Sequence, residues 1–569
     1  MDEKLEQVRH SAAHLLAHAI SHLYPGTKFA IGPATEKGFF YDFLPPENIK
    51  EEDLERIEAY MHTLATKNCA IEHYQVSKKE AQELFAHNPF KLELIDGIEG
   101  DTVGIAEQDD FKDLCKGGHV PSTGKIQHFK LTSISGAYWR GNKDNQALQR
   151  IHGTAFLTAK SLRTYEKQRA EALKYDHRKL GKEMELFSFH KEGVGFPFFH
   201  PKGQTIINTL SGFMRNLLGK HSYQEIATPT MLSQDLWKQS GHYEHYHDNM
   251  YFSHVDEDMH AIKPMNCPGA FLIYNNRPRS YRELPLKLSE FGHVHRHELS
   301  GVLHGLMRVR AFTIDDTHIF CMPEQIEEQI ITVLNLVQTT MHAVGFEKLK
   351  IGLSTKPEKA MGSDEVWEQA IDALKNALEK NGHEFEICEG EGAFYGPKIE
   401  VRTEDSLGRE WQCGTIQVDF FQPQNFDMSY IAPSGKKERP VIIHHAIYGS
   451  FERFLAILLE HHKGKLPFWL SPVQARVLSI TDEQKQYAQT IVDALASQEV
   501  RVELDNSSDP ISGKIKRAQN DRVAWMLVVG QKEQDNKAIT LRYRNGKQEF
   551  GLSLEQLLGK IQEETPSKI

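Results

Sequence analysis

Cysteine is scarce in this sequence, with six residues among 569, at positions 69, 115, 267, 321, 388 and 413. Six scattered cysteines without a Cys-x-x-Cys pair exclude a disulfide framework and favour a reducing compartment. Long apolar runs are also missing, so no segment is expected to span a membrane. The opening MDEKLEQVRH lacks both the basic-then-apolar profile of a secretory signal and the Arg-rich, acid-poor character of a transit peptide. We therefore expect a cytoplasmic protein that does not contact membranes.

The chain has no excess of basic residues, since its formal net charge is −11. This acidity does not exclude a nucleic-acid partner, because binding a polyanion needs only a local basic face. A composition of 40% hydrophobic and 25% charged residues excludes collagen-like, disordered and fibrous chains. The length of 569 residues predicts several domains rather than one.

Changes in residue pattern divide the chain into four segments. Residues 1–155 begin with a helical period and continue through Gly-rich and β-branched stretches, which predicts an α+β module. Residues 156–182 predict a connecting helix with a basic, solvated face. Residues 183–468 form the largest block, and residues 469–569 alternate short strands with helices. The chain is thus expected to combine α+β and α/β domains.

The two later segments differ in their strands. In the block 183–468, strand-like runs occur without a regular strand-helix-strand rhythm, which predicts an antiparallel sheet; these runs are residues 399–405, 409–421 and 439–447. In the last segment, buried strands flank a helix expected at about residues 482–498. That order of elements predicts a compact α/β domain with a mostly buried sheet.

A first group of candidate functional residues combines an HxxxH pair with a CxxxH pair. His10 and His14 are four residues apart and share a helix face, so they can converge with Cys115 and His119 on one cavity. Four such groups can hold zinc, or they can line a polar pocket that orients water and a substrate. His18 and His22 continue the same spacing on the helix. Because this stripe drifts around the helix, at least one or two of these four helix histidines are expected to be surface residues.

A second group lies between residues 289 and 321. Arg296 and Glu298 form an Arg-x-Glu unit, and Arg308 and Phe312 follow on what we expect to be an adjacent strand, joined through the loop 299–305. Arg offers a planar fork to phosphate, Glu accepts from an exocyclic amine, and Phe presents a ring for a purine to stack on. Together they predict an ATP site without a glycine-rich P-loop. A salt-bridged hairpin explains any one of these residues but not the whole set.

A third group combines Arg453 with three possible metal ligands. Gly449 and Arg453 stand at the start of an apolar helix directly after a strand, where an Arg can neutralise a terminal phosphate. The ligand types of a zinc centre with one open position are supplied by Cys267, His318 and His444, with Cys267 in a turn bounded by Pro and Gly. A free Cys is more often a small buried hydrophobic residue. His445 follows His444 on a strand, so the two side chains are expected on opposite faces.

These residues resemble the signature motifs of class II aminoacyl-tRNA synthetases. The run Arg296-His297-Glu298 with Arg308 and Phe312 is similar to motif 2, Gly449 to Arg453 to motif 3, and TPTM around Pro229 to the end of motif 1. Five short runs are similar, nearly residue for residue, to sequences of the threonyl-tRNA synthetase family: MNCPG, LHGLMRVR, DDTHIF, FYGPKIE and WQCGTIQVDF. The resemblance covers essentially the whole chain. It implies an editing domain at 1–155, a class II antiparallel catalytic core at 183–468 and an anticodon-binding domain at 469–569.

The resemblance implies that L-threonine attacks the α-phosphate of ATP and that the acyl group then passes to tRNA-Thr. In the family pattern, Arg296 would hold the α-phosphate, Arg453 the γ-phosphate, and Glu298 and Phe312 the adenine, with Arg308 also at ATP and Mg²⁺ bridging the phosphates. Lys398 would stabilise developing phosphate charge, although a surface Lys after a Gly-Pro turn is the ordinary alternative. Such chemistry relies on positioning and charge stabilisation.

The family also implies one Zn²⁺ per subunit on Cys267, His318 and His444, with threonine chelating its open side. Asp316 would accept from the threonine hydroxyl, helped by Tyr395 and Gln412. Serine differs from threonine only by a methyl group, so binding alone cannot reject it. A second site must therefore hydrolyse mischarged Ser-tRNA. The family's editing residues would be His10, His14, Asp113, Cys115 and His119, without a metal.

Other implications concern partners and departures from the family. A homodimer formed through motif 1 and anticodon contacts by Glu533 and Arg542 are implied, whereas the loop 505–510 lacks the usual Arg-Asn-Glu pattern. The HxxxH helix begins almost at Met1, so we expect this chain to lack the extra N-terminal domain of many members. Ile314 replaces a common Gln and His445 a common Arg, which affects the fine contacts to substrate. The alternative function is a tRNA-binding paralogue that regulates or only deacylates.

Overall fold

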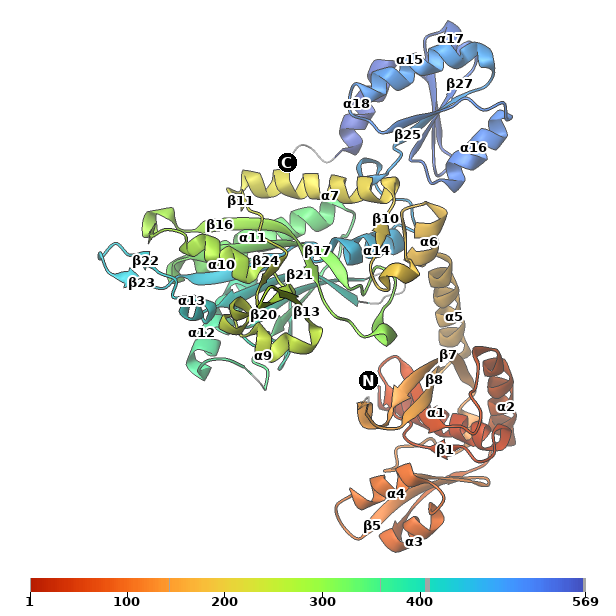
Figure 1. The fold of residues 1–569 in the computed structure, drawn as a ribbon. Coiled ribbons are helices and arrows are strands. Elements are labelled where there is room, and N and C mark those ends of the chain that lie inside the picture. Colours follow the sequence, from red (N-terminus) through yellow and green to blue (C-terminus); the bar gives the residue numbers. More distant parts are fainter. Residues whose placement is uncertain (1, 143, 359, 405–409, 566–569) are drawn as a thin grey trace. The chain divides into compact units, whose positions relative to one another are not determined.

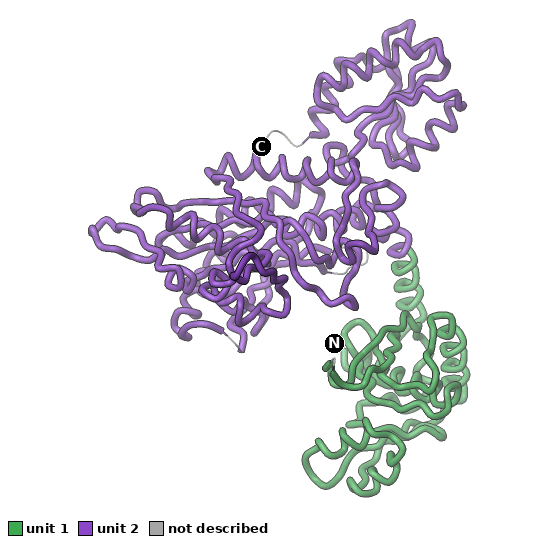
Figure 2. Tube along the Cα trace, viewed as in Figure 1, with its two compact units in different colours: residues 1–170 green, residues 171–569 purple. Residues whose placement is uncertain are grey.

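The computed structural model describes residues 2–142, 144–358, 360–404 and 410–565. Two compact units can be separated, residues 1–170 and residues 171–569, shown in green and purple in Figure 2. Asp405 and Arg409, at the ends of two strands expected from the sequence, lie outside the described residues. No helix in the described part of the chain is both long enough and apolar enough to cross a membrane.

The first unit is the expected α+β module. Its five-stranded sheet has the order β1-β3-β8-β7 with β2 paired to β3, and a second sheet has the order β4-β5-β6. Its elements are α1 (Glu3–Leu23), β1 (Lys28–Phe29), β2 (Ala34–Thr35), β3 (Gly38–Leu44), α2 (Leu54–Lys67), β4 (Ile71–Ser77), α3 (Lys78–Leu84), α4 (Pro89–Asp96), β5 (Thr102–Gln108), β6 (Phe111–Leu114), β7 (His128–Tyr138) and β8 (Ala147–Phe156).

Helix α1 is the long helix of this unit and carries the HxxxH pair. Asp2 caps it by accepting a hydrogen bond from the Lys4 N–H. The acidic residues in its first turn interact favourably with the positive end of the helix dipole. Its apolar face, which includes Leu15 and Leu16, is buried against β3 and β8. This packing fixes the helix and therefore the direction in which His10 and His14 point.

The expected single connecting helix is in fact two helices. Helix α5 (Ala159–Lys174) ends before Asp176, whose side chain accepts from the Arg178 N–H and so caps a new helix, α6 (His177–Glu183). The carboxylate that caps α6 also forms a bidentate pair with the Arg178 guanidinium. A side chain that caps a helix N-terminus in this way marks a helix boundary, even where the helical residue period continues through it.

The second unit is built around an eight-stranded sheet of order β11-β16-β17-β24-β21-β20-β18-β19 (Figure 1). Its inner pairs are antiparallel, as expected, whereas the outer pairs β11-β16 and β18-β19 are parallel. The strands are β11 (Gln224–Glu225), β16 (Leu286–His295), β17 (Ala311–Cys321), β18 (Lys350–Ser354), β19 (Glu386–Cys388), β20 (Lys398–Glu404), β21 (Glu410–Asp419) and β24 (Val441–Ala446).

Helices and smaller sheets surround this large sheet. The helices are α7 (Pro201–Lys220), α8 (Gln234–Gln239), α9 (His242–Tyr246), α10 (Cys267–Asn275), α11 (Ile326–Ala343), α12 (Asp364–Lys380), α13 (Gln422–Asn425) and α14 (Phe451–His461). The remaining strands are β9 (Phe187–Ser188), β10 (Phe198–Phe199), β12 (Met231–Ser233), β13 (Tyr251–Val255), β14 (Asp258–Ile262), β15 (Arg279–Ser280), β22 (Tyr430–Ile431) and β23 (Lys437–Glu438).

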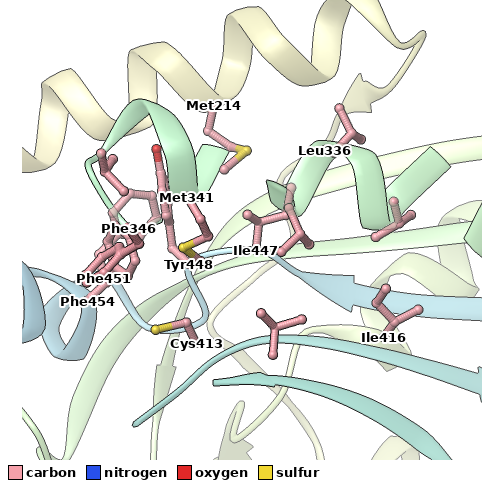
Figure 3. Packing of buried hydrophobic residues seen from close by; sticks show 14 of the residues in the cluster. Met214, Leu336, Met341, Phe346, Cys413, Ile416, Ile447, Tyr448, Phe451 and Phe454 are labelled. Carbon is pink, nitrogen blue, oxygen red and sulfur yellow. The ribbon is translucent and has the colours of Figure 1, made fainter. Parts of the chain in front are cut away.

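The two faces of the large sheet bury different sets of residues. Ile319 and Ile443 point into a core that includes residues of α11, α12 and α14, part of which Figure 3 shows around Phe451, Phe454 and Ile416. Their neighbours Phe320 and Ile442 belong to a second cluster that contains α10 residues. Because side chains alternate along a strand, His318 and His444 lie on the α10 face and His445 on the opposite face.

Two local expectations need correction. The loop between β16 and β17 runs from 296 to 310, so Arg308 lies in the loop and not on a strand. Cys267 is the first residue of helix α10 and not part of an irregular turn, because Pro268 suits the first turn of a helix, where its missing N–H costs no hydrogen bond.

The last part of the second unit is an α/β domain, as the sequence predicts. Its sheet has the order β26-β25-β27-β28-β29, and Val477 and Leu527 are buried on one face while Leu478 and Met526 are buried on the other. Its elements are β25 (Ala475–Ser479), α15 (Lys485–Ala496), β26 (Val502–Asp505), α16 (Ile511–Asn520), β27 (Trp525–Val529), α17 (Gln531–Asp535), β28 (Ile539–Tyr543), β29 (Gln548–Leu552) and α18 (Leu554–Glu564).

Candidate active sites

A cavity of about 430 Å³ lies over the large sheet of the second unit. Its wall is formed by residues of β17, β21, β24 and α14, by the loop around Tyr395, and by the N-terminus of α10. The candidate residues among its lining are Cys267, Arg296, Phe312, Asp316, Tyr395, Gln412, His444 and Arg453. Residues almost two hundred positions apart in sequence therefore share one hollow.

The three candidate metal ligands converge beside this cavity. One ligand atom from each of Cys267, His318 and His444 lies within 4.8 Å of the other two, and all three residues are buried. His318 on β17 is paired with His444 on β24 across the strand ladder, and their ring centroids are 4.9 Å apart. Cys267 is added by the first turn of α10.

The hydrogen bonds around the trio fit a cation. His444 Nε2 lies 3.0 Å from Asp419 Oδ2, so Nε2 carries the proton and donates it, which leaves a lone pair on Nδ1. Among the described residues, His444 Nδ1 and His318 Nε2 are buried without a hydrogen-bond partner. Two orphaned imidazole nitrogens beside a thiol are the donor set that Zn²⁺ accepts, and the carboxylate behind His444 orients the ring as in many metal sites.

Burial strongly affects the acids and thiol of this region. Burial, together with the charges of Asp316 and Asp419, raises the pKa of the Cys267 thiol well above its usual 9.0. Burial also raises the pKa of Asp316 to about 6, although Asn266 Nδ2 donates a 3.1 Å hydrogen bond to its carboxylate. Without a cation, both groups therefore tend towards their neutral forms.

The two arginines of the cavity are held in similar ways. Arg296 donates from Nε to Pro264 O at 3.2 Å, and Arg453 donates from Nε to Met307 O at 3.0 Å. The described residues thus anchor each guanidinium through Nε, which leaves the terminal nitrogens available to phosphate oxygens. The Arg296 guanidinium also lies over the Phe312 ring, 5.1 Å from its centroid.

Four of the candidate residues do not line the described cavity wall: His318, which lies beside it with the other possible metal ligands, and Glu298, Arg308 and Lys398. Glu298 and Arg308 pair with each other in the 296–310 loop at 2.9 Å, and Arg308 is half exposed. Lys398 pairs with Glu400 at 2.5 Å on β20. Glu298 and Arg308 therefore form the salt bridge that the sequence suggested as the alternative to a nucleotide site. Contacts of Glu298, Arg308 and Lys398 to a nucleotide stay predictions.

Two residues of the site, Gln417 and Asp419, were not identified from the sequence. Asp419 follows Gln417 at the strand period of two on β21, and this alternation could have identified both; Gln417 Oε1 accepts from the Tyr395 hydroxyl at 2.5 Å. Ile314 is part of the cavity wall. His445, as expected from strand alternation, has a different partner from His444, since its Nε2 lies 2.7 Å from the Tyr223 hydroxyl.

The candidate quartet of the first unit also converges. Cys115 Sγ lies 3.0 Å from His119 Nε2 and 3.5 Å from His10 Nε2, and His10 Nε2 lies 3.3 Å from His14 Nε2. His14 Nδ1 lies 3.1 Å from Asp113 Oδ2. Asp113 is buried and is contacted as well by the Lys91 ammonium and the Tyr41 hydroxyl, both at 2.5 Å.

These contacts create a charged pocket. Burial opposes charging of His14, but Asp113 outweighs it and raises the pKa of His14 to about 9. Burial likewise opposes ionisation of Cys115, but hydrogen bonds from His10, His119 and His14 lower the pKa of its thiol to about 3. At neutral pH the pocket therefore holds a thiolate next to an imidazolium, with a buried carboxylate behind it.

His18 and His22 form a separate group. Both place Nε2 close to Asp110 Oδ1, at 2.9 and 3.1 Å. The prediction that at least one of the four helix histidines is a surface residue is confirmed, since His22 is exposed, whereas His18 is buried against the Phe111 ring. Gln108 Nε2 lies 3.4 Å from His18 Nδ1, so Nδ1 accepts and Nε2–H donates to Asp110, an arrangement that does not suit a metal at Nε2.

Of the two candidate anticodon readers, Glu533 lies on α17 and Arg542 on β28. The Glu533 carboxylate accepts from the Gly530 N–H and from the Thr540 hydroxyl, so it also caps α17. Arg542 is half-buried, and its Nε is without a partner among the described residues. Two carboxylates of the loop that departs from the family pattern, Asp505 and Asp509, pair with Arg517 on α16.

Comparisons with known families match three parts of the chain. The class II core domain of the tRNA synthetases for G, H, P, S and T matches residues 251–462, an anticodon binding domain matches residues 474–564, and the second additional domain of threonyl and alanyl tRNA synthetases matches residues 103–152. With its antiparallel core and the cavity described above, the chain has the architecture of a class II aminoacyl-tRNA synthetase.

Similarity to individual proteins identifies the family within this class. The threonine–tRNA ligase of Carboxydothermus hydrogenoformans is 50% identical over 569 residues, which cover 99% of this chain and 90% of that protein. A solved structure described as the RNA binding domain of threonyl-tRNA synthetase from Cryptosporidium parvum is 44% identical with a TM-score of 0.67, covering 69% of this chain and 99% of its own. A putative threonyl-tRNA synthetase from Aeropyrum pernix is 31% identical with a TM-score of 0.62, covering 68% and 95%. The chain belongs to the threonine–tRNA ligase family.

Proposed function

We propose that this protein ligates L-threonine to tRNA-Thr through a threonyl adenylate and hydrolyses Ser-tRNA that it has mischarged. The observation that carries the proposal is the cavity lined by Arg296, Arg453, Cys267 and His444, with His318 beside it to complete the trio. Two guanidinium groups suit a nucleotide triphosphate, and a three-ligand metal site suits an amino acid with a second donor group.

Selection of threonine is proposed to depend on the trio. Cys267, His318 and His444 would hold one Zn²⁺, which when bound supplies a Lewis-acidic position for the amino and hydroxyl groups of threonine. Asp316, held by Asn266, would accept from the threonine hydroxyl, and Tyr395 and Gln412 would frame the substrate. Valine lacks the hydroxyl, and a site that requires a missing polar group can reject such an analogue by about 10⁴ to 10⁵.

Adenylate formation is proposed to depend on the arginines. Arg296 would contact the α-phosphate and Arg453 the γ-phosphate, with adenine on Phe312 and Mg²⁺ arriving with ATP. Glu298, Arg308 and Lys398 would join the site when their present ion pairs open for the nucleotide. No covalent intermediate on the protein is needed, because positioning and charge stabilisation carry an in-line displacement.

Editing is proposed for the quartet of the first unit. Serine keeps the hydroxyl of threonine and loses only a methyl group, a difference of about 1–3 kcal/mol in binding. His10, His14, Cys115 and His119 would position water and the seryl ester, while Asp113 keeps His14 charged. The four ligand atoms meet the same distance condition as those of the trio, but Cys115 Sγ is already paired with His10 and His119, so we assign no metal to this pocket.

The remaining parts of the proposal concern organisation and partners. We propose editing, connecting, catalytic and anticodon-binding segments at 1–155, 156–182, 183–468 and 469–569, with Glu533 and Arg542 as anticodon readers. We also propose a homodimer formed through the motif 1 region around Pro229, as the family resemblance implies. A cytoplasmic location is supported by six cysteines that are all unpaired.

The experiment that tests the proposal is ATP–pyrophosphate exchange with threonine, serine and valine offered separately. We expect exchange with threonine, weaker exchange with serine, and almost none with valine. Hydrolysis of Ser-tRNA-Thr is measured on the same preparation. Exchange without a preference for threonine would refute the assignment, and hydrolysis without any exchange would favour a protein that only deacylates.

A further inference from the structure

The buried residue His177 connects three elements that are far apart in the sequence. It is the first residue of α6, and its side chain is completely buried. Its Nδ1 lies 2.7 Å from Glu460 Oε1 on α14, and its Nε2 lies 3.1 Å from the backbone N of Leu306 in the 296–310 loop. The same Glu460 oxygen accepts from the backbone N–H of His177 at 3.2 Å.

The backbone partner fixes the protonation of the ring. A backbone N–H can only donate, so Nε2 of His177 must be the acceptor of the Leu306 bond. The ring proton then lies on Nδ1 and is donated to the Glu460 carboxylate. Although Asp176, His177 and Glu460 are close enough to form a metal cluster, both ring nitrogens are already used. The arrangement is therefore a hydrogen-bonded strap and not a metal site.

The loop is shaped to receive this histidine. Gly305 has a φ of +49°, and a Cβ at this position would approach His177 Nε2 to 2.1 Å. The two residues that follow, Leu306 and Met307, are buried. Only glycine allows the loop to lie this close to the imidazole, because any side chain would occupy the place of the hydrogen bond.

The other side of the same turn is held by Arg453. Its Nε donates to Met307 O at 3.0 Å, one residue after the N–H that His177 accepts. Arg453 and Glu460 are seven residues apart on α14 and so lie on one face of the helix. The turn is thus attached to α14 twice, directly through Arg453 and indirectly through His177 and Glu460.

We propose that His177 is a positioning residue for ATP: it fixes the 305–307 turn so that the Arg453 guanidinium and the neighbouring Arg308 meet the phosphates in a set geometry. This inference rests on the proposed function, since it assumes that the cavity binds ATP. His177 does not line the described cavity and so acts through the turn. A displacement of about 1 Å in a positioning group can cost about a hundredfold in rate.

The test compares His177→Ala, Glu460→Ala, the double variant and Glu460→Gln in threonine-dependent ATP–pyrophosphate exchange. We expect KM for ATP to rise about tenfold or more in both alanine variants, with KM for threonine changed much less. The double variant should be no worse than the poorer single variant, because both changes break one strap. Glu460→Gln keeps an acceptor for the Nδ1 proton and should stay close to the unchanged protein.

Controls separate this role from a loss of folding or of function. His254→Ala replaces an exposed histidine of β13 and should leave every parameter unchanged. Hydrolysis of Ser-tRNA, which needs no ATP, should persist in all variants. An unchanged KM for ATP in His177→Ala, or equal losses for ATP, threonine and hydrolysis, would overturn the proposal. If His177→Ala does not fold, additive effects of Glu460→Ala and Gly305→Ala on the KM for ATP would overturn it instead, because both changes break the same strap. Absence of exchange in the unmodified protein would instead refute the proposed function.

Discussion

The replacement Asp419→Asn probes the proposed metal site without removing a proposed ligand. Asp419 is completely buried; its Oδ1 accepts from the backbone N–H groups of Phe421 and Gln422 at 2.8 and 3.0 Å, and its Oδ2 accepts from His444 Nε2 at 3.0 Å. After the replacement, the carbonyl oxygen of the new side-chain amide must face the two backbone donors, so its NH₂ group must face His444. Two donors would then meet at Nε2 unless the imidazole changes its tautomer.

The change of tautomer is what should damage the site. With the proton moved from Nε2 to Nδ1, the buried nitrogen that has no hydrogen-bond partner among the described residues can no longer donate a lone pair to a cation. Loss of a carboxylate behind a metal-bound histidine typically costs about 10- to 100-fold in metal affinity. This corresponds to about 1.4 to 2.7 kcal/mol. Because the tautomer is inverted and the charge is lost as well, we expect the upper part of this range.

The assay is zinc retention against a competing chelator, read together with the KM for threonine in ATP–pyrophosphate exchange. Both should worsen in Asp419→Asn, and added zinc should restore part of the exchange. Asp427→Asn is the matched control, since that carboxylate is 93% exposed and pairs only with Arg439 among the described residues. Zinc affinity and threonine KM equal to those of the control, in a folded Asp419→Asn protein, would refute the reasoning.

Three further outcomes are expected. Cys267→Ala should abolish threonine activation and leave Ser-tRNA hydrolysis measurable; activation that survives removal of the metal would show that the trio is not needed. His10→Ala combined with His14→Ala should keep exchange intact while Ser-tRNA-Thr accumulates, and unchanged hydrolysis would remove the editing assignment. Because Asp113 raises the pKa of His14 from 6.5 to about 9, the stabilisation from this pair is complete below pH 6.5 and is lost as pH rises through about 9. The melting temperature should fall across that window, and Asp113→Asn should flatten the fall.

The periods of apolar residues predicted much of this fold, because helices and strands are specified largely by residues that are close in sequence. The helix with the HxxxH pair, the antiparallel character of the large sheet and the α/β order of the last domain follow from residue periods and are confirmed. Strand alternation also separated His444 from His445 correctly. The break between α5 and α6 was missed, because one capping carboxylate at Asp176 overrides a helical period that continues on both sides.

Partners brought together only by tertiary structure could not be predicted. Asp419 and His177 are ordinary residues in the sequence, and their importance depends on His444, Glu460 and Leu306, which no spacing rule links to them. The candidate ligands could be proposed by residue type, whereas the unpartnered nitrogens that favour a cation exist only in the folded chain. A prediction of chemistry from residue types therefore needs the hydrogen-bond partners before it becomes specific.

The two Cys/His clusters of this chain illustrate how charged and hydrogen-bonded neighbours determine the chemistry of a cluster. In the first unit the imidazoles and Asp113 supply compensating charges, so Cys115 ionises with a pKa of about 3 and the polar atoms satisfy one another. In the second unit no positive group lies within the trio, and burial and nearby carboxylates raise the pKa of Cys267 well above 9.0. The same ligand types thus carry compensating charges in one cluster and leave two buried imidazole nitrogens without hydrogen-bond partners in the other. This difference in charge balance, and not the sequence spacing, is our reason for proposing zinc at Cys267, His318 and His444 and ester hydrolysis at the quartet.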